Sequence, residues 1–395
     1  MGRRKTRTEN MSLILKQIWY HDGISRIEIS DKVGLNKSTV TNLVTELILL
    51  GVLEEREQKE TNNVGGRKPI ALGLNKNYGI VLGLGVQAEM IRAVAVDIAG
   101  DIVFRWKKET GQITRRNIID VFLESFDELS ASLMERGFSN LLGIGLGAGG
   151  IINPLTGVVE YSIPLSIYEP FPLCEVLSRH INAPVYIEND SNCGAWMELA
   201  FGKANSPDNF LFVLVEFKNR RQHIKEHGGI GIGFGIVLDG KLHYGNTFSA
   251  GEFRSAFSRG EYASQMRISP EDLHKLPEDK AVMDRFLDEL FANIACIVNV
   301  LNISHVYLGG DIELLGDSVC DMLTEYIMKN WMYPLPVHCN VKMSSLHEFA
   351  VAYGAAGMIL DRIFRNDLHD SFWQNIDKRG VLPALIRHPL PIVSK

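Results

Sequence analysis

Residues 25–44 read SRIEISDKVGLNKSTVTNLV and decide the architecture of the N-terminal part of this 395-residue chain. Ser25 and Glu28 have the spacing of a capping box, in which each side chain accepts a hydrogen bond from the backbone N–H of the other residue. This spacing predicts a short helix from Ser25 to Gly34. Asn36 predicts the cap of a following helix, whose apolar residues keep helical spacing as far as Gly51. Two helices joined by so short a turn are typical of a helix-turn-helix.

The flanking sequence extends this unit to a winged helix. Apolar residues with helical spacing predict a first helix from about Thr8 to Tyr20. After Gly51, two extended stretches flank a turn-rich segment and predict a β-hairpin wing. The polar side of the last helix and the wing tip supply the candidate DNA contacts, which are Lys37, Ser38, Thr39, Thr41, Asn42, Arg67 and Lys68. The alternative is a helical protein-interaction module with a solvated loop.

The charge distribution agrees with a DNA-binding head. Residues 1–76 contain 13 Lys and Arg against 9 Asp and Glu, which gives a net charge of +4. Because the whole chain has a net charge of −6, the remaining residues carry −10. A chain of this length predicts two to three domains. The sequence contains no apolar run long enough for a membrane span and no secretory leader, which predicts a cytoplasmic protein. Five widely spaced cysteines predict reduced thiols rather than disulfides or a zinc knuckle.

The remaining sequence alternates strand-like and helical patterns, and one pattern occurs twice. Three strand-like runs at residues 79–108 are followed by a helix and a strand, and so are three runs at residues 210–245. This duplication predicts two layered α/β lobes with a ligand cleft between them. We expect a winged helix-turn-helix domain at residues 1–76, a first lobe at residues 77–200 plus about 345–395, and a second lobe at residues 201–344.

Five short motifs give this body a resemblance to a known family. They are GLGAGGIIN at 145–153, IENDSN at 187–192, GIGIGFG at 229–235, SAGEF at 249–253 and LGGD at 308–311. In this order they resemble the ROK family (repressors, open reading frames and kinases), and with the winged head the likeness covers nearly the whole chain. The resemblance implies a duplicated actin-like and hexokinase-like (ribonuclease H-like) fold. It also implies a carbohydrate in the cleft and, for members with a DNA-binding head, repression of sugar-utilisation genes.

The resemblance also implies a sugar site. In ROK kinases the Asp at the position of Asp190 is the base for the attacked hydroxyl, and the residue at Asn189 hydrogen-bonds the sugar. Asn153 and Glu252 match other positions that line the sugar pocket. A carboxylate beside an amide suits a polyol, because together they accept from and donate to adjacent hydroxyls. Without the family match, the 188–192 run could be only a polar strand-to-helix turn.

Two departures from the family pattern argue against enzymatic and metal chemistry. The kinases have an Asp-x-Gly-Gly-Thr motif that binds the nucleotide phosphates, and this chain has Gly85-Val-Gln-Ala-Glu89 at that position. The carboxylate of Glu89 would repel phosphate. Where many members have a zinc-binding His, this chain has Ser255 and no cysteine nearby. We therefore expect no kinase activity, no cofactor and no metal. The sequence leaves open whether Arg254, Ser255 or Glu261 supply substitute sugar contacts, and a metal site at His223 and His227 is disfavoured.

These inferences predict a transcriptional repressor that binds operator DNA as a homodimer or a dimer of dimers and responds to a sugar or polyol. The alternative enzyme is an ATP-dependent sugar kinase of the ROK family that kept a DNA-binding head, in which Asp190 would be catalytic. A DNA-bound scaffold that no longer senses a ligand is a third reading. The identity of the sugar and the direction of its effect on DNA binding stay open.

Overall fold

In the computed structural model, the described residues are 6–56, 70–202, 205–217, 230–260, 264–344 and 346–365. The N-terminal domain contains three helices and a two-stranded antiparallel sheet. Their bounds are α1 Arg7–Tyr20, α2 Arg26–Val33, α3 Lys37–Leu49, β1 Leu53–Arg56 and β2 Ala71–Leu74. None of the described helices is long and apolar enough to cross a membrane.

The predicted caps of the helix-turn-helix are confirmed. Ser25 and Glu28 form a reciprocal capping box at the start of α2, and the left-handed Gly34 ends that helix. The side chain of Asn36 accepts from the backbone N–H of Thr39 at 2.8 Å and so caps α3. Strand β1 pairs with β2, as expected for the predicted β-hairpin wing. The wing tip, residues 57–69, lies outside the described residues.

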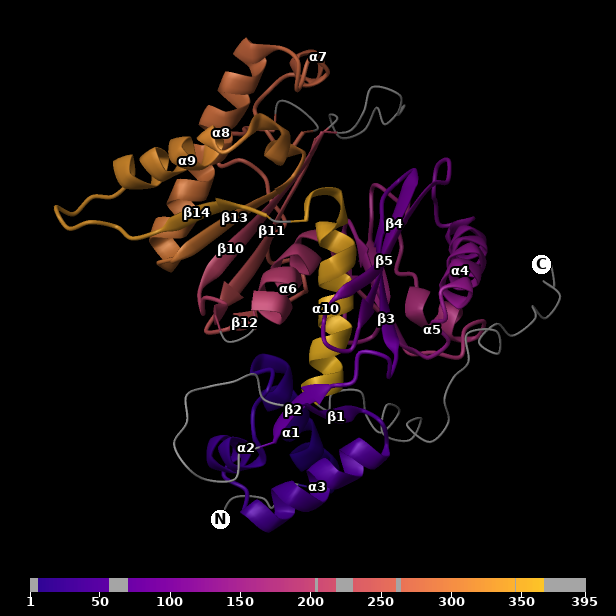
Figure 1. The fold of residues 1–395 in the computed structure, drawn as a ribbon. Coiled ribbons are helices and arrows are strands. Elements are labelled where there is room, and N and C mark those ends of the chain that lie inside the picture. Colours follow the sequence, from indigo (N-terminus) through magenta and orange to yellow (C-terminus); the bar gives the residue numbers. More distant parts are fainter. Residues whose placement is uncertain are drawn as a thin grey trace.

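The first lobe is built on a five-stranded sheet with the order β5-β4-β3-β6-β9. Strands β3, β6 and β9 are parallel, and β4 and β5 extend the sheet antiparallel. The elements are β3 Ile80–Val86, β4 Met90–Asp97, β5 Ile102–Glu109, α4 Ile118–Glu135, β6 Leu141–Ala148, β7 Ile151–Asn153, β8 Val158–Tyr161, α5 Leu173–Ser178 and β9 Val185–Asn189. Helices α4 and α5 cover one face of this sheet (Figure 1).

The second lobe repeats this plan with the order β12-β11-β10-β13-β14. In both sheets an antiparallel hairpin is followed by strands that are parallel to its first member. The elements are β10 Phe210–Phe217, β11 Ile230–Leu238, β12 Lys241–Leu242, α7 Pro270–Leu273, α8 Lys280–Leu301, β13 His305–Gly310, η2 Asp311–Leu315, α9 Ser318–Lys329 and β14 Asn340–Met343. Helices α8 and α9 pack on one face through a long apolar stripe. The two lobes confirm the expected duplicated α/β fold.

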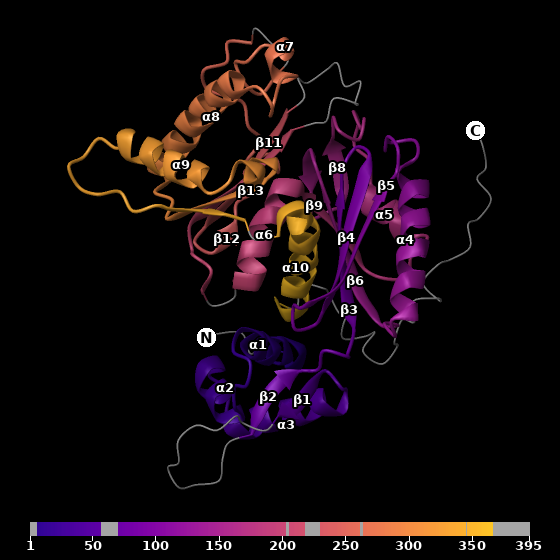
Figure 2. The ribbon, with the colours of Figure 1, turned by 45° about the horizontal axis from the view of Figure 1, so that its top comes forward.

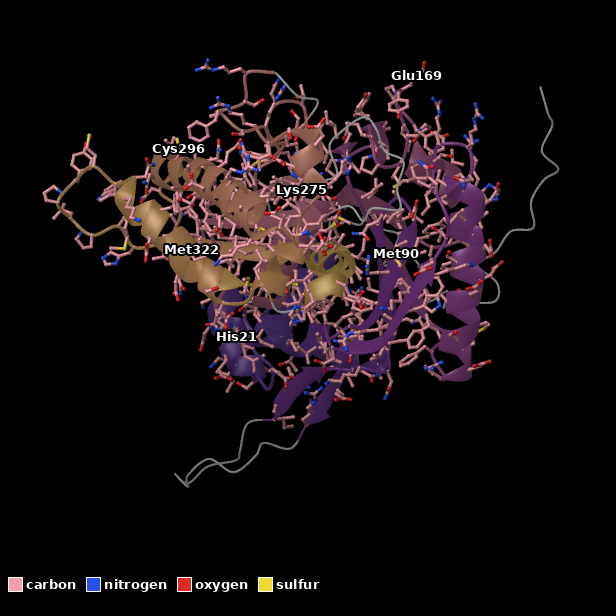
Figure 3. The ribbon with its side chains drawn as sticks, turned by 90° about the horizontal axis from the view of Figure 1, so that it is seen from above. His21, Met90, Glu169, Lys275, Cys296 and Met322 are labelled. Atoms are coloured by element: carbon pink, nitrogen blue, oxygen red, sulfur yellow. The ribbon has the colours of Figure 1, made fainter. Side chains whose placement is uncertain are left out.

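Two helices lie between the sheets and hold the parts together. They are α6 Asp190–Gly202 and α10 Ala350–Arg365, which follows the short η3 His347–Phe349. Helix α10 packs on β3, β6 and α6, while α6 also packs on β10 and β11 (Figure 2). The lower end of α10 in Figure 1 meets α1, and one continuous apolar core joins the winged helix to the first lobe. Viewed from above, Lys275 and Cys296 lie on the second lobe, apart from Met90 and Glu169 on the first (Figure 3).

Candidate functional site

The cleft between the lobes contains a cavity of about 420 Å³, which we call the first cavity. Its walls come from the turn after β6, the β9–α6 junction, β10, β11 and the segment after β12. Its lining residues include Gly149, Gly150, Asn189, Asp190, Glu216, Ile232, Glu252, Phe253 and Gln265. Gly150 has φ +125°, and a Cβ there would meet the carbonyl oxygen of Tyr161 at 2.3 Å. Only glycine therefore fits this wall.

The structure brings Asn189, Asp190 and Glu252 together on this cavity, although Glu252 comes from the other lobe. Asn189 is heavily engaged by the protein. Its Oδ1 accepts from the N–H of Ser191 at 2.9 Å, the hydroxyl of Ser191 at 2.6 Å and the N–H of Asn192 at 3.2 Å, and its Nδ2 donates to the carbonyl oxygen of Gly150 at 3.0 Å. Asn189 thus fixes the first turn of α6 and leaves one amide hydrogen for a ligand.

Asp190 and Glu252 present carboxyl groups to the first cavity. Asp190 is the first residue of α6, and one of its oxygens accepts from the N–H of Ser191 at 2.7 Å. Glu252 is exposed toward the open cleft, yet desolvation by the surrounding protein raises its pKa. Two carboxyl groups on opposite walls can accept from hydroxyls on both sides of one polyol.

Glu188 and Tyr244 form a buried support that sequence reasoning did not assign. Glu188 is fully buried at the end of β9, and desolvation raises its pKa. It accepts from the N–H of Asn189 at 2.9 Å, the amide of Asn192 at 3.0 Å and the hydroxyl of Tyr244 at 2.8 Å. Tyr244 follows β12, so this hydrogen bond joins the two lobes directly behind the Asn189–Asp190 pair. Only the position of Glu188 within the 187–192 motif signalled it.

Asn153 is placed differently from the other candidates. It ends β7, and its Oδ1 accepts from the N–H groups of Leu155 at 3.2 Å and Thr156 at 3.3 Å. The side chain therefore closes the turn between β7 and β8, and Asn153 is not among the described residues that line the first cavity. A ligand role for Asn153 stays a prediction.

A second cavity of about 480 Å³ adjoins the first and shares Asp190, Leu214 and Glu216 with it. Gly85, Val86 and Gln87 of the predicted phosphate-loop position line it. Its carboxylates are Asp190, Glu216, Asp311, Glu313 and Glu348, and its other ionisable residues are Arg92 and His347. Glu89 is not among the described lining residues. The acidic residues of this cavity thus come from segments far from residues 85–89 in the sequence. The sequence analysis did not predict them.

Hydrogen bonds and an ion pair join the side chains around Gln87 in the second cavity. Gln87 donates to Glu216 and accepts from Arg92, while Arg92 pairs with Glu348 at 3.1 Å. Glu313, which is almost fully buried, pairs with His347. Burial raises the pKa of both Asp311 and Glu313. Arg92, whose guanidinium would attract an anion, is therefore already paired with the carboxylate of Glu348.

The DNA-contact candidates of the last helix share one exposed side of α3. Lys37, Ser38, Thr41 and Asn42 are exposed, and Thr39 is partly buried. The hydroxyl of Ser38 donates to Asn36 at 2.8 Å, and that of Thr41 donates to the carbonyl oxygen of Lys37 at 2.8 Å. Arg67 and Lys68 lie outside the described residues.

Of the residues left open as substitute sugar contacts, Arg254 is exposed and is not among the described residues that line the first cavity. No group of three or more His, Cys, Asp or Glu that could hold a metal occurs among the described residues. Ser255 is buried against Asn293 rather than on the first cavity. Glu261, His223 and His227 lie outside the residues that the structure describes.

Comparison with known proteins agrees with this arrangement. Residues 81–254 match the ROK family, and residues 7–54 match a winged helix-turn-helix DNA-binding domain. The chain thus carries a ROK family domain behind a winged helix-turn-helix, which confirms the resemblance. It is 25% identical to the xylose repressor of Caldicellulosiruptor bescii, over 89% of this chain and 95% of that protein.

Solved structures share the fold. A ROK family transcriptional regulator, described as a homologue of the E. coli MLC protein, superposes with a TM-score of 0.72 at 17% identity and covers 94% of this chain and 99% of its own. A ROK family glucokinase from Streptomyces griseus, in complex with glucose and AMPPNP, gives 0.53 at 19% identity and covers 71% of this chain and 99% of its own. The regulator matches the winged head as well as the body, whereas the kinase covers less of the chain.

Proposed function

We propose that this protein is a DNA-binding repressor of carbohydrate-utilisation genes whose operator affinity is set by a sugar or polyol in the first cavity. One observation carries the proposal: the cavity with carboxyl groups on both walls lies at the start of α6, and α6 packs on α10, the helix that shares an apolar core with the winged helix-turn-helix. The likeness to a xylose repressor makes D-xylose the first effector to test.

The lining of the first cavity favours an uncharged ligand. Asp190, Glu216 and Glu252 face it, and none of the described residues that line it is Lys, Arg or His. A phosphorylated sugar would bring two negative charges beside these carboxyl groups, and no described residue of the lining carries a positive charge to offset them. A neutral sugar instead gains charge-assisted hydrogen bonds from its hydroxyls. We therefore infer that the effector is an unphosphorylated sugar or polyol bound by Asn189, Asp190 and Glu252.

The second cavity supports the absence of kinase activity. An ATP-dependent sugar kinase needs a place for polyphosphate and magnesium next to Asp190. Here the loop at 85–89 lacks the glycine pair, Gln87 is tied to Glu216 and Arg92, and the surrounding carboxylates would repel phosphate. The kinase reading predicts magnesium-dependent phosphorylation of a sugar by ATP that Asp190→Asn abolishes. The absence of that activity over a broad sugar panel would remove it.

The DNA interface is proposed on the exposed side of α3. Lys37, Ser38, Thr39, Thr41 and Asn42 would enter the major groove, with Arg67 and Lys68 of the wing beside it. A two-fold operator would be read by a homodimer or a dimer of dimers in the cytoplasm. The winged domain at 1–76 and the two lobes, at 77–200 with 345–395 and at 201–344, are the proposed division of the chain.

Capture of fragmented genomic DNA on the purified protein tests this function. We expect enrichment of a few fragments at moderate salt and a change in their retention when one neutral sugar, such as D-xylose, is added to the wash. Unselective retention that disappears with salt would contradict the repressor. Selective retention that no sugar changes would leave a DNA-binding scaffold.

A further inference from the structure

The segment that carries Glu252, residues 249–253, packs against β11. Phe234 of β11 donates its N–H to the carbonyl oxygen of Gly251 at 3.0 Å, and Gly233 forms a bridge with Glu252. Gly251 has φ +92°, and a Cβ there would lie 1.8 Å from the carbonyl oxygen of Phe234. We call residues 249–253 the Glu252 segment. Its approach to β11 sets how far Glu252 stands from Asp190 on the opposite wall.

A side-chain carboxamide adds to the hydrogen bonds between this segment and the strand. The Oε1 of Gln265 accepts from the N–H of Ile232 at 2.8 Å, and its Nε2 donates to the carbonyl oxygen of Ile232 at 2.7 Å. The same Nε2 donates to the carbonyl oxygen of Phe253 at 2.9 Å. In antiparallel sheets, a residue of the next strand makes this paired exchange with Ile232. Gln265 therefore takes the place of a neighbouring strand and adds a bond to the Glu252 segment.

We infer that Gln265 is a positioning residue for sugar recognition, which holds Glu252 at the distance from Asp190 that the ligand requires; this inference rests on the proposed function. Ile232, Phe253 and Gln265 itself all line the first cavity. The three bonds use the only oxygen and both amide hydrogens of the side chain. The carboxylate of a glutamate would lack both donors, and the thioether of a methionine would lack the oxygen and both donors. A binding site is selective only when its polar groups are held to within about half an ångström.

Asn293 provides a matched comparison in the same lobe. It lies on α8, is buried, and makes three side-chain hydrogen bonds: it accepts from the N–H of Ala256 at 2.9 Å and donates to Ser255 at 3.2 Å and to the carbonyl oxygen of Glu289 at 2.7 Å. Asn293, Ser255 and Ala256 are not among the described residues that line the first cavity. Two of its bonds go to residues just after the Glu252 segment, so loss of Asn293 removes as many bonds without removing one to a residue that lines the first cavity.

The test compares Gln265→Met and Asn293→Leu with the unchanged full-length chain. D-xylose is titrated by calorimetry, sugar-free operator affinity is measured by fluorescence anisotropy, and thermal unfolding is recorded. We expect Gln265→Met to weaken xylose binding by about tenfold or more, because Glu252 is then no longer held at its distance from Asp190. Its operator affinity should stay unchanged. Asn293→Leu should lower the unfolding temperature at least as much but change xylose affinity less.

A second variant and local hydrogen exchange keep the inference testable. Gln265→Glu keeps the acceptor for Ile232 but places its other oxygen against two carbonyl oxygens, so it should weaken xylose binding at least as much as Gln265→Met. In both variants the faster amide exchange should be confined to the Glu252 segment and the start of β11. Unchanged xylose affinity in both variants, or an equal loss in Asn293→Leu, would overturn the inference. Failure of the unchanged chain to bind xylose or any other sugar would instead overturn the proposed function on which the inference rests.

Discussion

The indole N–H of Trp19, on α1 of the winged helix, donates to the carbonyl oxygen of Ala99 in the turn between β4 and β5 at 3.3 Å. The Trp19 ring also packs on Phe364 of α10, with 4.7 Å between ring centroids. Both contacts are deep in a core that the winged helix shares with the first lobe. These contacts fix the DNA-binding head to the first lobe, so the two are not joined only by a flexible linker.

A contiguous set of contacts leads from the first cavity to this anchor. Helix α6 starts at Asp190 on the cavity and ends beside Phe201, whose ring stacks on Tyr353 of α10 at 3.6 Å. The hydroxyl of Tyr353 donates to the carbonyl oxygen of Gly100 at 2.7 Å, next to the Ala99 that holds Trp19. A ligand that shifts α6 would therefore displace the turn against which the head packs.

Trp19→Phe should uncouple the sugar from DNA binding, because it removes the bond to Ala99 and part of the ring contact. We expect nearly unchanged xylose affinity and sugar-free operator affinity. The sugar-induced change in operator affinity should shrink by about 0.5–2 kcal/mol. Operator titrations with and without D-xylose measure it. Trp106→Phe is the control, since Trp106 packs in the core under α4, away from the head. An undiminished sugar effect in Trp19→Phe would contradict this route.

Asp190→Asn and Asn189→Ala should both abolish the sugar response, but they should differ in stability. Asp190→Asn removes a charged acceptor from the cavity and changes little of the scaffold. Asn189→Ala also removes the cap of α6, which costs about 1 kcal/mol. Calorimetric titration with D-xylose and thermal unfolding separate the two effects. Operator affinity should be retained in both, and retained xylose binding in Asp190→Asn would place the sugar elsewhere.

Glu198 makes stability depend on pH. It lies on α6, and burial raises its pKa to about 7, with Lys342 acting in the opposite direction. The folded chain therefore binds one more proton than the unfolded chain between the ordinary pKa of 4.5 and about 7. The free energy of unfolding should fall as the pH rises through this range and stay low above it. Glu198→Gln should stabilise the protein by about 1–3 kcal/mol at pH 8 and by little at pH 5.

Thermal unfolding of Glu198→Gln from pH 5 to pH 8 checks this expectation. Glu325→Gln on α9 serves as the control, because Glu325 is exposed beside Lys329. The two variants should diverge progressively as the pH rises from about 5 to about 7 and differ by a constant amount above it. Parallel pH profiles for Glu198→Gln and the unchanged protein would show that Glu198 does not titrate in this range.

Lys37→Ala should weaken binding to operator and to unrelated DNA alike, because a phosphate contact carries no sequence information. The salt slope of operator binding should fall by about 1. Asn42→Ala should instead weaken binding mainly to the operator, since it removes a base-reading amide. Lys241→Ala on β12 is the control for a lost surface charge. Equal operator affinity in Lys37→Ala and the unchanged protein would contradict the proposed docking.

The sequence by itself determined the winged helix, because its signals are local. The Ser25–Glu28 box and the Asn36 cap act over three residues, so spacing alone locates both helices. The repeated strand and helix patterns and the five motifs likewise predicted the duplicated body. The motifs at 187–192 and 249–253 supplied Asn189, Asp190 and Glu252, which the structure brings to one cavity.

Only the tertiary structure decided which residues surround that cavity and what each is free to do. Tyr244 reaches Glu188, and Gln87 reaches Glu216, across separations of 56 and 129 residues. Asn153 accepts hydrogen bonds within its own turn, and Gln265 makes the hydrogen bonds to Ile232 that a neighbouring strand would otherwise make. The sequence shows that these side chains are polar, but the packing of the two lobes determines which partners they contact. Hydrogen-bond partners far apart in the chain leave no periodic or local trace that could be read before folding.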